Sequence, residues 1–470
     1  MNKSVAIVGG GVAGIAAAAA LADAGFAVQI FEKRPLLGGR ASSFLDHQTG
    51  ERTDECQHGT MRCCVNLADL LERLGVHDQI QYFDALEFLD GDGKRSQIKG
   101  CGLPAPAHTA VSFLRFKSLG IRDKIVIARA LFAMLRTPPS AEWDAISVAQ
   151  WFQKMGQTER AIQRFWRPIL VSACNEALAR ISAANAFKIF RDGFLLNETA
   201  FHFGLSKVPL GTLYHEPAIN YLKARNGCVR VRTIVDRMEI AGGVNGEVSG
   251  IVLNDGERVE ADYYLSALQC DLLLKILPPE VTAGVPYFEN LRGIEFAPIA
   301  GIHLWFNKTL DCPASLALLD RKTEWIFNKN KIFGLPDSET TYLSMVISAS
   351  HDLAAMPKEE LIALVLADVR ACVPDARDSE ILKSYVIRWP KATISPKAGA
   401  EALRPGQVSP LSNLFVAGEW TRTGWPSTME GAARSGYLAA EALLAKENRP
   451  QKILVPYLKP GALARLLARF

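Results

Sequence analysis

Apolar runs of strand length alternate with helix-like stretches at both ends of the chain. Residues 4–8 and 27–31 are short apolar runs, and the alanine-rich residues 15–24 lie between them. Near the other end, the apolar run 414–417 precedes residues 429–445, in which small and apolar residues recur at helical spacing. Apolar strands that alternate with helices are typical of a sheet with helices on its faces. The pattern therefore predicts an α/β fold to which both ends of the chain contribute.

Three further strand-like runs lie in the centre of the chain. They cover residues 229–235, 248–253 and 261–265, and the turn-forming residues Asn245-Gly246 and Asn254-Asp-Gly256 separate them. Successive strands joined by tight turns predict a β-meander.

The first strand runs directly into a glycine-rich loop. Gly9, Gly11 and Gly14 form G-x-G-x-x-G, and Glu32 ends the second strand eighteen residues later. Gly9 permits the tight turn, Gly11 lets the backbone approach a pyrophosphate, and Gly14 lets helix and strand pack closely. The helix N-terminus offers N–H groups to the phosphates, and the acid can accept hydrogen bonds from ribose hydroxyls. We predict a dinucleotide site with the residues Gly9, Gly11, Val12, Ala13, Gly14, Glu32 and Lys33.

The stretch after the second strand indicates which dinucleotide is bound. Arg34-Pro-Leu-Leu-Gly38-Gly39-Arg40 resembles the R-x-G-G-R segment of amine-oxidase and phytoene-desaturase-like flavoproteins. Gly39 would allow a second backbone approach to phosphate, with Arg40 as a fixed cation over it. Nicotinamide dehydrogenases generally lack this extension, so we predict FAD as the cofactor.

The C-terminal strand and helix agree with FAD. The same resemblance implies that Gly418-Glu419 meets the ribityl and pyrophosphate region, and that the helix beginning at Met429-Glu430 points at the flavin pyrimidine. A helix dipole there would stabilise negative charge on the reduced ring. The resemblance also implies that a backbone amide near Val235 meets the adenine. Glu419 stands where aspartate is commoner, and residues 429–437 contain no cysteine, so a covalent flavin link is not expected.

Cofactor motifs at opposite ends of the chain require a discontinuous cofactor domain. The chain has 470 residues, of which 49% are hydrophobic, and can form two or three domains. We predict an amine-oxidase-like architecture, in which a Rossmann-like FAD-binding domain carries the β-meander and a mixed sheet with helices forms the substrate domain. The FAD-binding domain is expected to comprise residues 1–75, 225–270 and 396–445. The substrate domain is expected to comprise the mostly helical residues 76–224 and the mixed residues 271–395.

Two segments combine basic residues with large apolar ones at helical spacing. Residues 446–470 hold six basic residues against Glu447, and residues 111–140 hold six against Asp123. Basic amphipathic helices suit the surface of an anionic membrane, although ordinary packed helices with solvated basic faces have the same pattern. We expect peripheral membrane contact, and no motif indicates nucleic acid binding.

Cysteine and histidine spacing argues against metal and disulfides. The nine cysteines are scattered without a C-x-x-C pair, and the eight histidines form no H-x-x-x-H cluster. We expect core thiols in a reducing cytoplasm and no metal site. The chain begins on its first strand and lacks eighteen consecutive apolar residues, so we predict neither a signal segment nor a membrane span. The expected location is the cytoplasm, at the inner face of the bacterial cytoplasmic membrane.

Four blocks narrow the resemblance. They lie at residues 54–75, 165–176, 184–194 and 420–431, and together they resemble squalene-associated FAD enzymes, in particular the hydroxysqualene dehydroxylase family. That resemblance implies reductive removal of an allylic hydroxyl from a C30 isoprenoid, the last step of a bacterial route to squalene used for hopanoids. Glu55-Cys56 and residues 389–393 depart from the family's commoner residues.

The implied reaction needs an acid and an apolar pocket. An acid helps the hydroxyl leave as water, and hydride comes from the reduced flavin. The candidates for the acid are Asp54, His58 and Asp192; His58 is also a candidate for flavin contact. Each has a structural alternative, namely a helix cap, a hydrogen bond near the flavin and a turn residue. Aromatic residues that could line the pocket and face a cation are Phe165, Trp166, Phe190, Phe194 and Trp425.

Other functions share these motifs. A carotenoid-type desaturase would run the hydride from substrate to flavin, and an amine oxidase would use a lysine such as Lys391. A non-catalytic FAD-bearing isoprenoid carrier is a further alternative. The sequence holds no second G-x-G-x-x-G. We therefore expect a separate electron donor, such as a flavin reductase or an NAD(P)H-linked protein, and squalene-synthase-like enzymes upstream.

Overall fold

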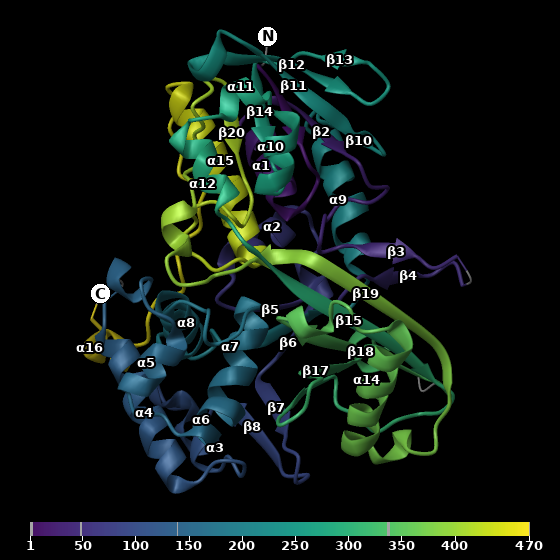
Figure 1. Ribbon diagram of the computed structural model, residues 1–470, viewed down its shortest axis with the longest axis vertical. Coiled ribbons are helices and arrows are strands. Elements are labelled where there is room, and N and C mark those ends of the chain that lie inside the picture. Colours follow the sequence, from purple (N-terminus) through teal and green to yellow (C-terminus); the bar gives the residue numbers. More distant parts are fainter. Residues whose placement is uncertain (1–2, 48, 139, 336–338, 470) are drawn as a thin grey trace.

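The computed structural model describes residues 3–47, 49–138, 140–335 and 339–469. Both ends of the chain form one five-stranded parallel sheet, in the order β10, β2, β1, β14 and β20. Its strands are β1 (Ser4–Val8), β2 (Ala27–Glu32), β10 (Cys228–Val231), β14 (Tyr263–Ser266) and β20 (Leu414–Val416). The helices of this half include α1 (Val12–Asp23), α2 (Val65–Arg73), α9 (Leu210–Lys223) and α15 (Met429–Lys446) (Figure 1).

The central strands differ from the predicted meander. The run 229–235 is two strands, because the backbone turns at Arg232, whose φ is +55°. β10 stays in the parallel sheet, and β11 (Val235–Ala241) pairs with β12 (Glu247–Leu253) and β13 (Arg258–Val259). The run 261–265 is not the third meander strand but becomes β14 of the parallel sheet, between β1 and β20.

A second sheet of seven strands forms the other half of the molecule. Its order is β19, β15, β18, β17, β16, β7 and β8, and β16 and β7 are the pair that run parallel. The helix α14 (Lys358–Cys372) packs against it through buried leucine and valine residues. The strands are β7 (Ala85–Leu89), β8 (Arg95–Lys99), β15 (Phe296–Phe306), β16 (Ser315–Leu318), β17 (Trp325–Asn328), β18 (Thr341–Ser348) and β19 (Ile381–Ile394).

A helical lobe continues from this sheet. It is built around one aromatic-rich core and contains two π-helical turns, residues 162–166 between α6 and α7 and residues 191–195 after α8. Its helices are α3 (Ala110–Leu114), α4 (Ile121–Arg136), α5 (Val148–Lys154), α6 (Glu159–Ala161), α7 (Arg167–Cys174) and α8 (Ala183–Phe190).

Short elements complete the chain. Three small strands, β5 (Gly59–Met61), β9 (Phe203–Ser206) and β6 (Ile80–Phe83), form a sheet between the two halves, and β3 (Ser43–Leu45) pairs with β4 (Arg52–Asp54). The remaining helices are α10 (Cys270–Ile276), α11 (Pro279–Thr282), α12 (Pro286–Arg292), α13 (Lys329–Phe333) and α16 (Ala462–Leu467).

In both segments expected to form the substrate domain, residues 76–224 and 271–395, some helices pack in the other half of the molecule. α9 lies within residues 76–224, yet its buried Leu210, Leu213 and Leu222 share one core with α1 and β1. Similarly, α10 and α12 pack in one core with Val8 and Val416 of the parallel sheet. In the first of these segments, β7 and β8 are strands that extend the seven-stranded sheet. The packing partner of each apolar face decides the half to which an element belongs, and the sequence does not specify that partner.

The segment 446–470 is not a free tail. Val455 donates its backbone N–H to Asn66 of α2, and Gly461 donates to the carbonyl of Leu196, both at 2.8 Å. It therefore crosses from the parallel-sheet half to the helical lobe, where α16 packs. Phe470, the last apolar residue of the expected tail, lies outside the described residues.

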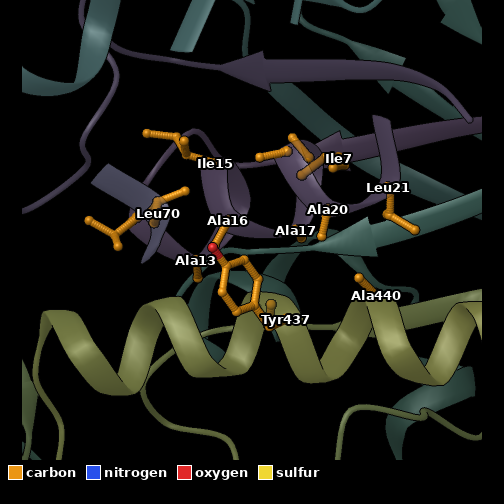
Figure 2. Packing of buried hydrophobic residues seen from close by; sticks show 14 of the residues in the cluster. Ile7, Ala13, Ile15, Ala16, Ala17, Ala20, Leu21, Leu70, Tyr437 and Ala440 are labelled. Carbon is orange, nitrogen blue, oxygen red and sulfur yellow. The ribbon is translucent and has the colours of Figure 1, made fainter. Parts of the chain in front are cut away.

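The two ends of the chain are joined by close packing of α1 on α15. Figure 2 shows Ala13, Ala16, Ala17 and Ala20 of α1 facing α15. A Cβ at Gly436 would lie 2.4 Å from the carbonyl oxygen of Ala13 and 2.7 Å from the amide of Ala17. Only residues with almost no side chain permit two helices to approach so closely.

We expect Gly436→Ala to lower the free energy of unfolding by about 1–3 kcal/mol, because the added methyl would overlap backbone atoms of α1. Chemical denaturation measures the change. Gly406→Ala is the control, since a Cβ there has no neighbour within 4 Å. Equal stability of both variants would contradict the packing described.

Candidate functional site

The turn between β1 and α1 leaves open space for a bound group, because no side chain of the turn projects into that space. Gly9 has a φ of +107°, and a Cβ at Gly14 would lie 2.0 Å from the Gly9 carbonyl oxygen, so both glycines are needed for the turn itself. A Cβ at Gly11 meets only the Cα of Gly39, at 3.8 Å. No side chain caps α1, whose first turn contains Val12 and Ala13 and no acidic residue. The open space beside Gly11 and these backbone N–H groups fit a pyrophosphate.

Glu32 ties the glycine turn to the second glycine loop. One carboxylate oxygen accepts the backbone N–H of Gly10 at 2.7 Å, and the other accepts that of Arg34 at 2.8 Å. Each oxygen retains a lone pair for a ribose hydroxyl. Thr233, two residues before Val235, donates its backbone N–H to the Glu32 carbonyl, which places the start of β11 beside this acid. Lys33 is exposed.

The motifs from the two ends of the chain meet at an ion pair. Arg40 donates to Glu419 at 2.6 Å and to the carbonyl of Ala392 at 2.7 Å. Glu419 is buried, and its second oxygen, Oε1, has no hydrogen-bond partner among the described residues. A buried carboxylate oxygen without a donor fits a hydroxyl of the ribityl chain. Gly418, with a φ of +148°, lets the chain turn there.

Arg404 is a positioning residue that the sequence patterns do not indicate. Its buried guanidinium donates to the carbonyls of Glu419, Thr421 and Trp425. These bonds hold the loop that carries Glu419. A single arginine in a loop has no distinguishing motif, and its five donors become informative only when their acceptors are in place.

At the start of α15, the two predicted flavin residues face different neighbours. Met429 lines a small cavity together with His58 and Tyr214. The buried carboxylate of Glu430 instead accepts the backbone N–H groups of Asn66 and Leu67, at 3.2 and 2.8 Å. It caps α2, and burial raises its pKa. The Glu430 carboxylate thus serves another helix, and the expected flavin contact at the N-terminus of α15 stays a prediction that concerns its backbone.

His58 also lines the small cavity that contains the side chains of Tyr214 and Met429 in its wall. Its Nδ1 lies 3.0 Å from the carbonyl oxygen of Cys56, a distance at which the ring donates from this nitrogen. Burial lowers the pKa of the imidazole. His58 is thus neutral at neutral pH, and its Nε2, which has no hydrogen-bond partner among the described residues, can accept a proton rather than donate one.

The predicted acid Asp54 is an ion-pair partner. Its carboxylate accepts from Ser43 Oγ at 2.8 Å, from the backbone N–H of Leu210 at 2.7 Å and from Lys329 Nζ at 3.1 Å. The side chains of Asp54 and Lys329 are 2% and 1% exposed, so water does not screen the pair. These contacts give Asp54 a structural role in an ion pair, and its role as the acid stays a prediction. Lys329, which also donates to Gln57, was not indicated by any motif.

Asp192 lies in the helical lobe. It pairs with Lys188 at 2.5 Å, one helical turn away. Lys188 in turn lies 4.9 Å from the ring centre of Trp425 and 4.0 Å from that of Tyr457. Asp192 is thus an ion-pair partner within the lobe, and its role as the acid stays a prediction.

The predicted pocket aromatics are mostly core. Trp166 and Phe190 are 0% and 1% exposed and pack edge to face at 4.7 Å, with Phe165 and Phe194 as neighbours. Rings enclosed by other rings cannot line a pocket wall, so the prediction is corrected for Trp166 and Phe190. Trp425 belongs to a separate cluster, where it stacks on Tyr457 at 5.7 Å.

Half-buried aromatic residues lie instead on the seven-stranded sheet, beside the loop of Asp54 and His58. A Cβ at Gly301 of β15 would lie 3.3 Å from Cys56 Sγ, so this face of the strand looks toward that loop. On the same face, Trp305 stacks on Tyr342 at 4.1 Å and meets Tyr385 at 5.9 Å. Alternation along the strand gives these residues their common direction.

The described residues also show the surroundings of Lys391 and of the cysteines. Lys391 pairs with Asp271 and is half exposed. The described cysteines are free; Cys101 and Cys228 are exposed, in contrast to the expected core thiols. Among the helices that the structure describes, none is long and apolar enough to cross a membrane. The described part of the chain holds no group of three or more His, Cys, Asp or Glu suited to a metal ion.

Residues 12–444 match the family model of flavin containing amine oxidoreductases. The chain is 26% identical to a 15-cis-phytoene desaturase of Synechococcus elongatus, over 95% of this chain and 97% of that protein. It is 27% identical to a zeta-carotene desaturase of Synechocystis sp., over 95% and 98%.

Solved structures share the fold. An oxidoreductase from Methanosarcina mazei superposes with a TM-score of 0.70 at 17% identity, over 94% of this chain and 100% of that one. Cyclohexylamine oxidase from Brevibacterium oxydans superposes with a TM-score of 0.68 at 17% identity, over 96% and 100%. The architecture is therefore that of amine-oxidase-like flavoproteins, and the glycine turn, Glu32 and the open oxygen of Glu419 fit FAD.

We expect Gly11→Val to abolish FAD retention while the protein still folds, since the side chain would occupy the space next to the pyrophosphate and contact little else. Flavin absorbance per protein and circular dichroism measure the two effects. Gly406→Val, at an open position away from the turn, should keep its flavin. Normal flavin content in a folded Gly11→Val protein would refute the cradle.

The pH dependence of stability should depend on His303, a fully buried residue of β15. Burial lowers its pKa to about 3, so between about pH 3 and 6.5 the unfolded chain binds a proton that the folded protein does not. Stability is complete above 6.5 and falls as the pH decreases, by up to about 1.4 kcal/mol per pH unit. Denaturation of wild type and His303→Asn across this range should give a shallower slope in the variant, and parallel slopes would contradict the burial effect.

Proposed function

The chain belongs to the flavin containing amine oxidoreductases, and we propose that it exchanges hydride between FAD and a long isoprenoid hydrocarbon. One observation carries the proposal. The desaturases named above, whose names specify phytoene and zeta-carotene as substrates, match this chain over nearly the whole length of both proteins. A match of that extent includes the substrate half as well as the cofactor half.

Two directions of hydride transfer are compatible with this proposal. In desaturation, the substrate loses a hydride and a proton from adjacent carbons and a C=C bond forms, as the names of the relatives suggest. In reductive dehydroxylation, a C–O bond breaks, the oxygen leaves as water, and carbon receives the hydride. The four sequence blocks that resemble the hydroxysqualene dehydroxylase family favour the second direction, with hydroxysqualene as substrate and squalene as product.

The protein's part in either direction is to hold the reactants. FAD, when bound, supplies the hydride acceptor or donor. The glycine turn and Glu32 would hold its adenosine and pyrophosphate, and Arg40 and Glu419 its central part. The positive end of the α15 dipole, at an N-terminus that Thr428 caps through the backbone N–H of Gly431, would favour negative charge on the ring.

Neutral His58 favours the desaturase direction. Desaturation requires a base that takes a proton after the hydride has left. Nε2 of His58 offers a lone pair for this at the cavity that His58 and Met429 line. Dehydroxylation requires a donor, which His58 becomes only after protonation against its lowered pKa. The half-buried rings of Trp305, Tyr342 and Tyr385 are the better candidates for a wall that contacts an apolar polyene.

The electron partner is also part of the proposal. A dehydroxylase would draw electrons from a flavin reductase or an NAD(P)H-linked protein, whereas a desaturase would pass electrons to an acceptor. Squalene-synthase-like enzymes would supply a C30 substrate in the first case.

An anaerobic experiment separates the two directions. We expect either that hydroxysqualene reoxidises the chemically reduced protein and yields squalene, or that phytoene bleaches the oxidised protein and yields a desaturated product. Flavin absorbance and lipid chromatography measure both, with the flavin-free Gly11→Val protein as control. Failure of both isoprenoids to change the flavin would refute the proposed substrate class.

A further inference from the structure

The helix α4 carries apolar residues on two opposite sides. Its inward side is buried in the core of the helical lobe. On its outward side, Ile121, Ile125 and Phe132 are 80%, 55% and 54% exposed. At about 100° per residue, these three fall within roughly 40° of one another on the helix. The inward side already satisfies the core, so folding of this lobe does not explain the outward apolar stripe.

Cations surround this stripe. Within the described residues, no carboxylate pairs with the exposed side chains of Arg115, Lys117, Arg122 and Arg129. The acid on α4, Asp123, is buried and accepts from the backbone of Gly120 at 2.8 Å. Asp123 therefore does not neutralise the cations on the outward side of α4, which stays positively charged.

The C-terminal segment extends the same surface. Arg136, at the end of α4, donates to the carbonyl of Leu467 at 3.1 Å, and the backbone N–H of Arg469 donates to Leu135 at 3.3 Å. Leu466 is 76% exposed, and its neighbour Arg465 is also exposed. Figure 1 shows α16 on the helical lobe, near α4 and α5 and away from the five-stranded sheet.

Lys124 connects α3 to this surface, because its ammonium donates to the carbonyl of Leu114 at 2.6 Å. Leu114 is 66% exposed. The α4–α16 face is the surface formed by Leu114, Arg115, Ile121, Arg122, Ile125, Arg129, Phe132, Arg465 and Leu466.

We propose that the α4–α16 face binds the surface of an anionic phospholipid membrane. Apolar side chains flanked by unpaired cations match a bilayer interface, where hydrocarbon lies below a layer of phosphates. A second copy of the chain is a poorer occupant, because two such faces would bring their arginines together. A neutral apolar partner would leave the cations without counter-charges.

Vesicle flotation with the full-length FAD-bound protein tests this. We expect the protein to float with vesicles of equimolar phosphatidylcholine and phosphatidylglycerol, to float far less with phosphatidylcholine alone, and to be released by high salt. Arg122→Glu with Arg129→Glu should lower partitioning by roughly tenfold or more. Ile121→Ser, Ile125→Ser and Phe132→Ser together should lower it as well.

Matched controls keep the two effects separate from folding. Lys223→Glu with Lys358→Glu changes the net charge equally at exposed positions elsewhere, and Leu382→Ser with Val408→Ser removes exposed apolar residues elsewhere. Both controls should float like wild type, and all variants should retain flavin. The measurement uses no substrate, so its outcome is independent of the proposed reaction.

Three results would overturn the inference. One is absence of flotation by the wild-type protein, and another is equal loss in variants and controls. The third is a dimer, seen by light scattering, that the apolar triple variant converts to monomer while vesicles bind neither protein; the face would then be an interface between copies.

Discussion

The close contact of α1 with α15 is the constraint on which the rest of the structure depends. Alanines and Gly436 let the backbones of two helices from opposite ends of the chain touch. That contact places β20 beside β14 in the parallel sheet and carries Glu419 to Arg40, 379 residues away. The cofactor cradle is thus assembled through the close packing of small residues.

Buried charges then define the loops around the cavity. The Lys329–Asp54 pair holds the loop of His58 against the seven-stranded sheet, and Glu430 holds α2 against α15. Each charge is buried with specific partners, and removing one partner would leave the other uncompensated in a medium that solvates it poorly. In the sequence, acids such as Asp54 and Glu430 can be mistaken for functional groups of the site. Their partners give them a positioning role.

The same distinction applies to the aromatic residues. Trp166 and Phe190 lie in sequence blocks that resemble those of the hydroxysqualene dehydroxylase family, yet other rings enclose them. Trp305 and Tyr342 lie on a strand face beside the cavity loop, in stretches without a motif. Sequence spacing identifies a helix or strand but not the neighbour that will cover each of its faces.

The sequence by itself determined the cofactor half: the glycine turn, Glu32, the second glycine loop and the C-terminal strand and helix are local patterns, in which each residue acts on its near neighbours in the chain. It also indicated the two basic amphipathic segments. Only the tertiary structure decided that these segments form one surface, that run 229–235 divides between two sheets at Arg232, and that Asp54 pairs with Lys329. The physical reason is that burial and pairing depend on partners hundreds of residues away, and no local pattern encodes which distant side chain will arrive.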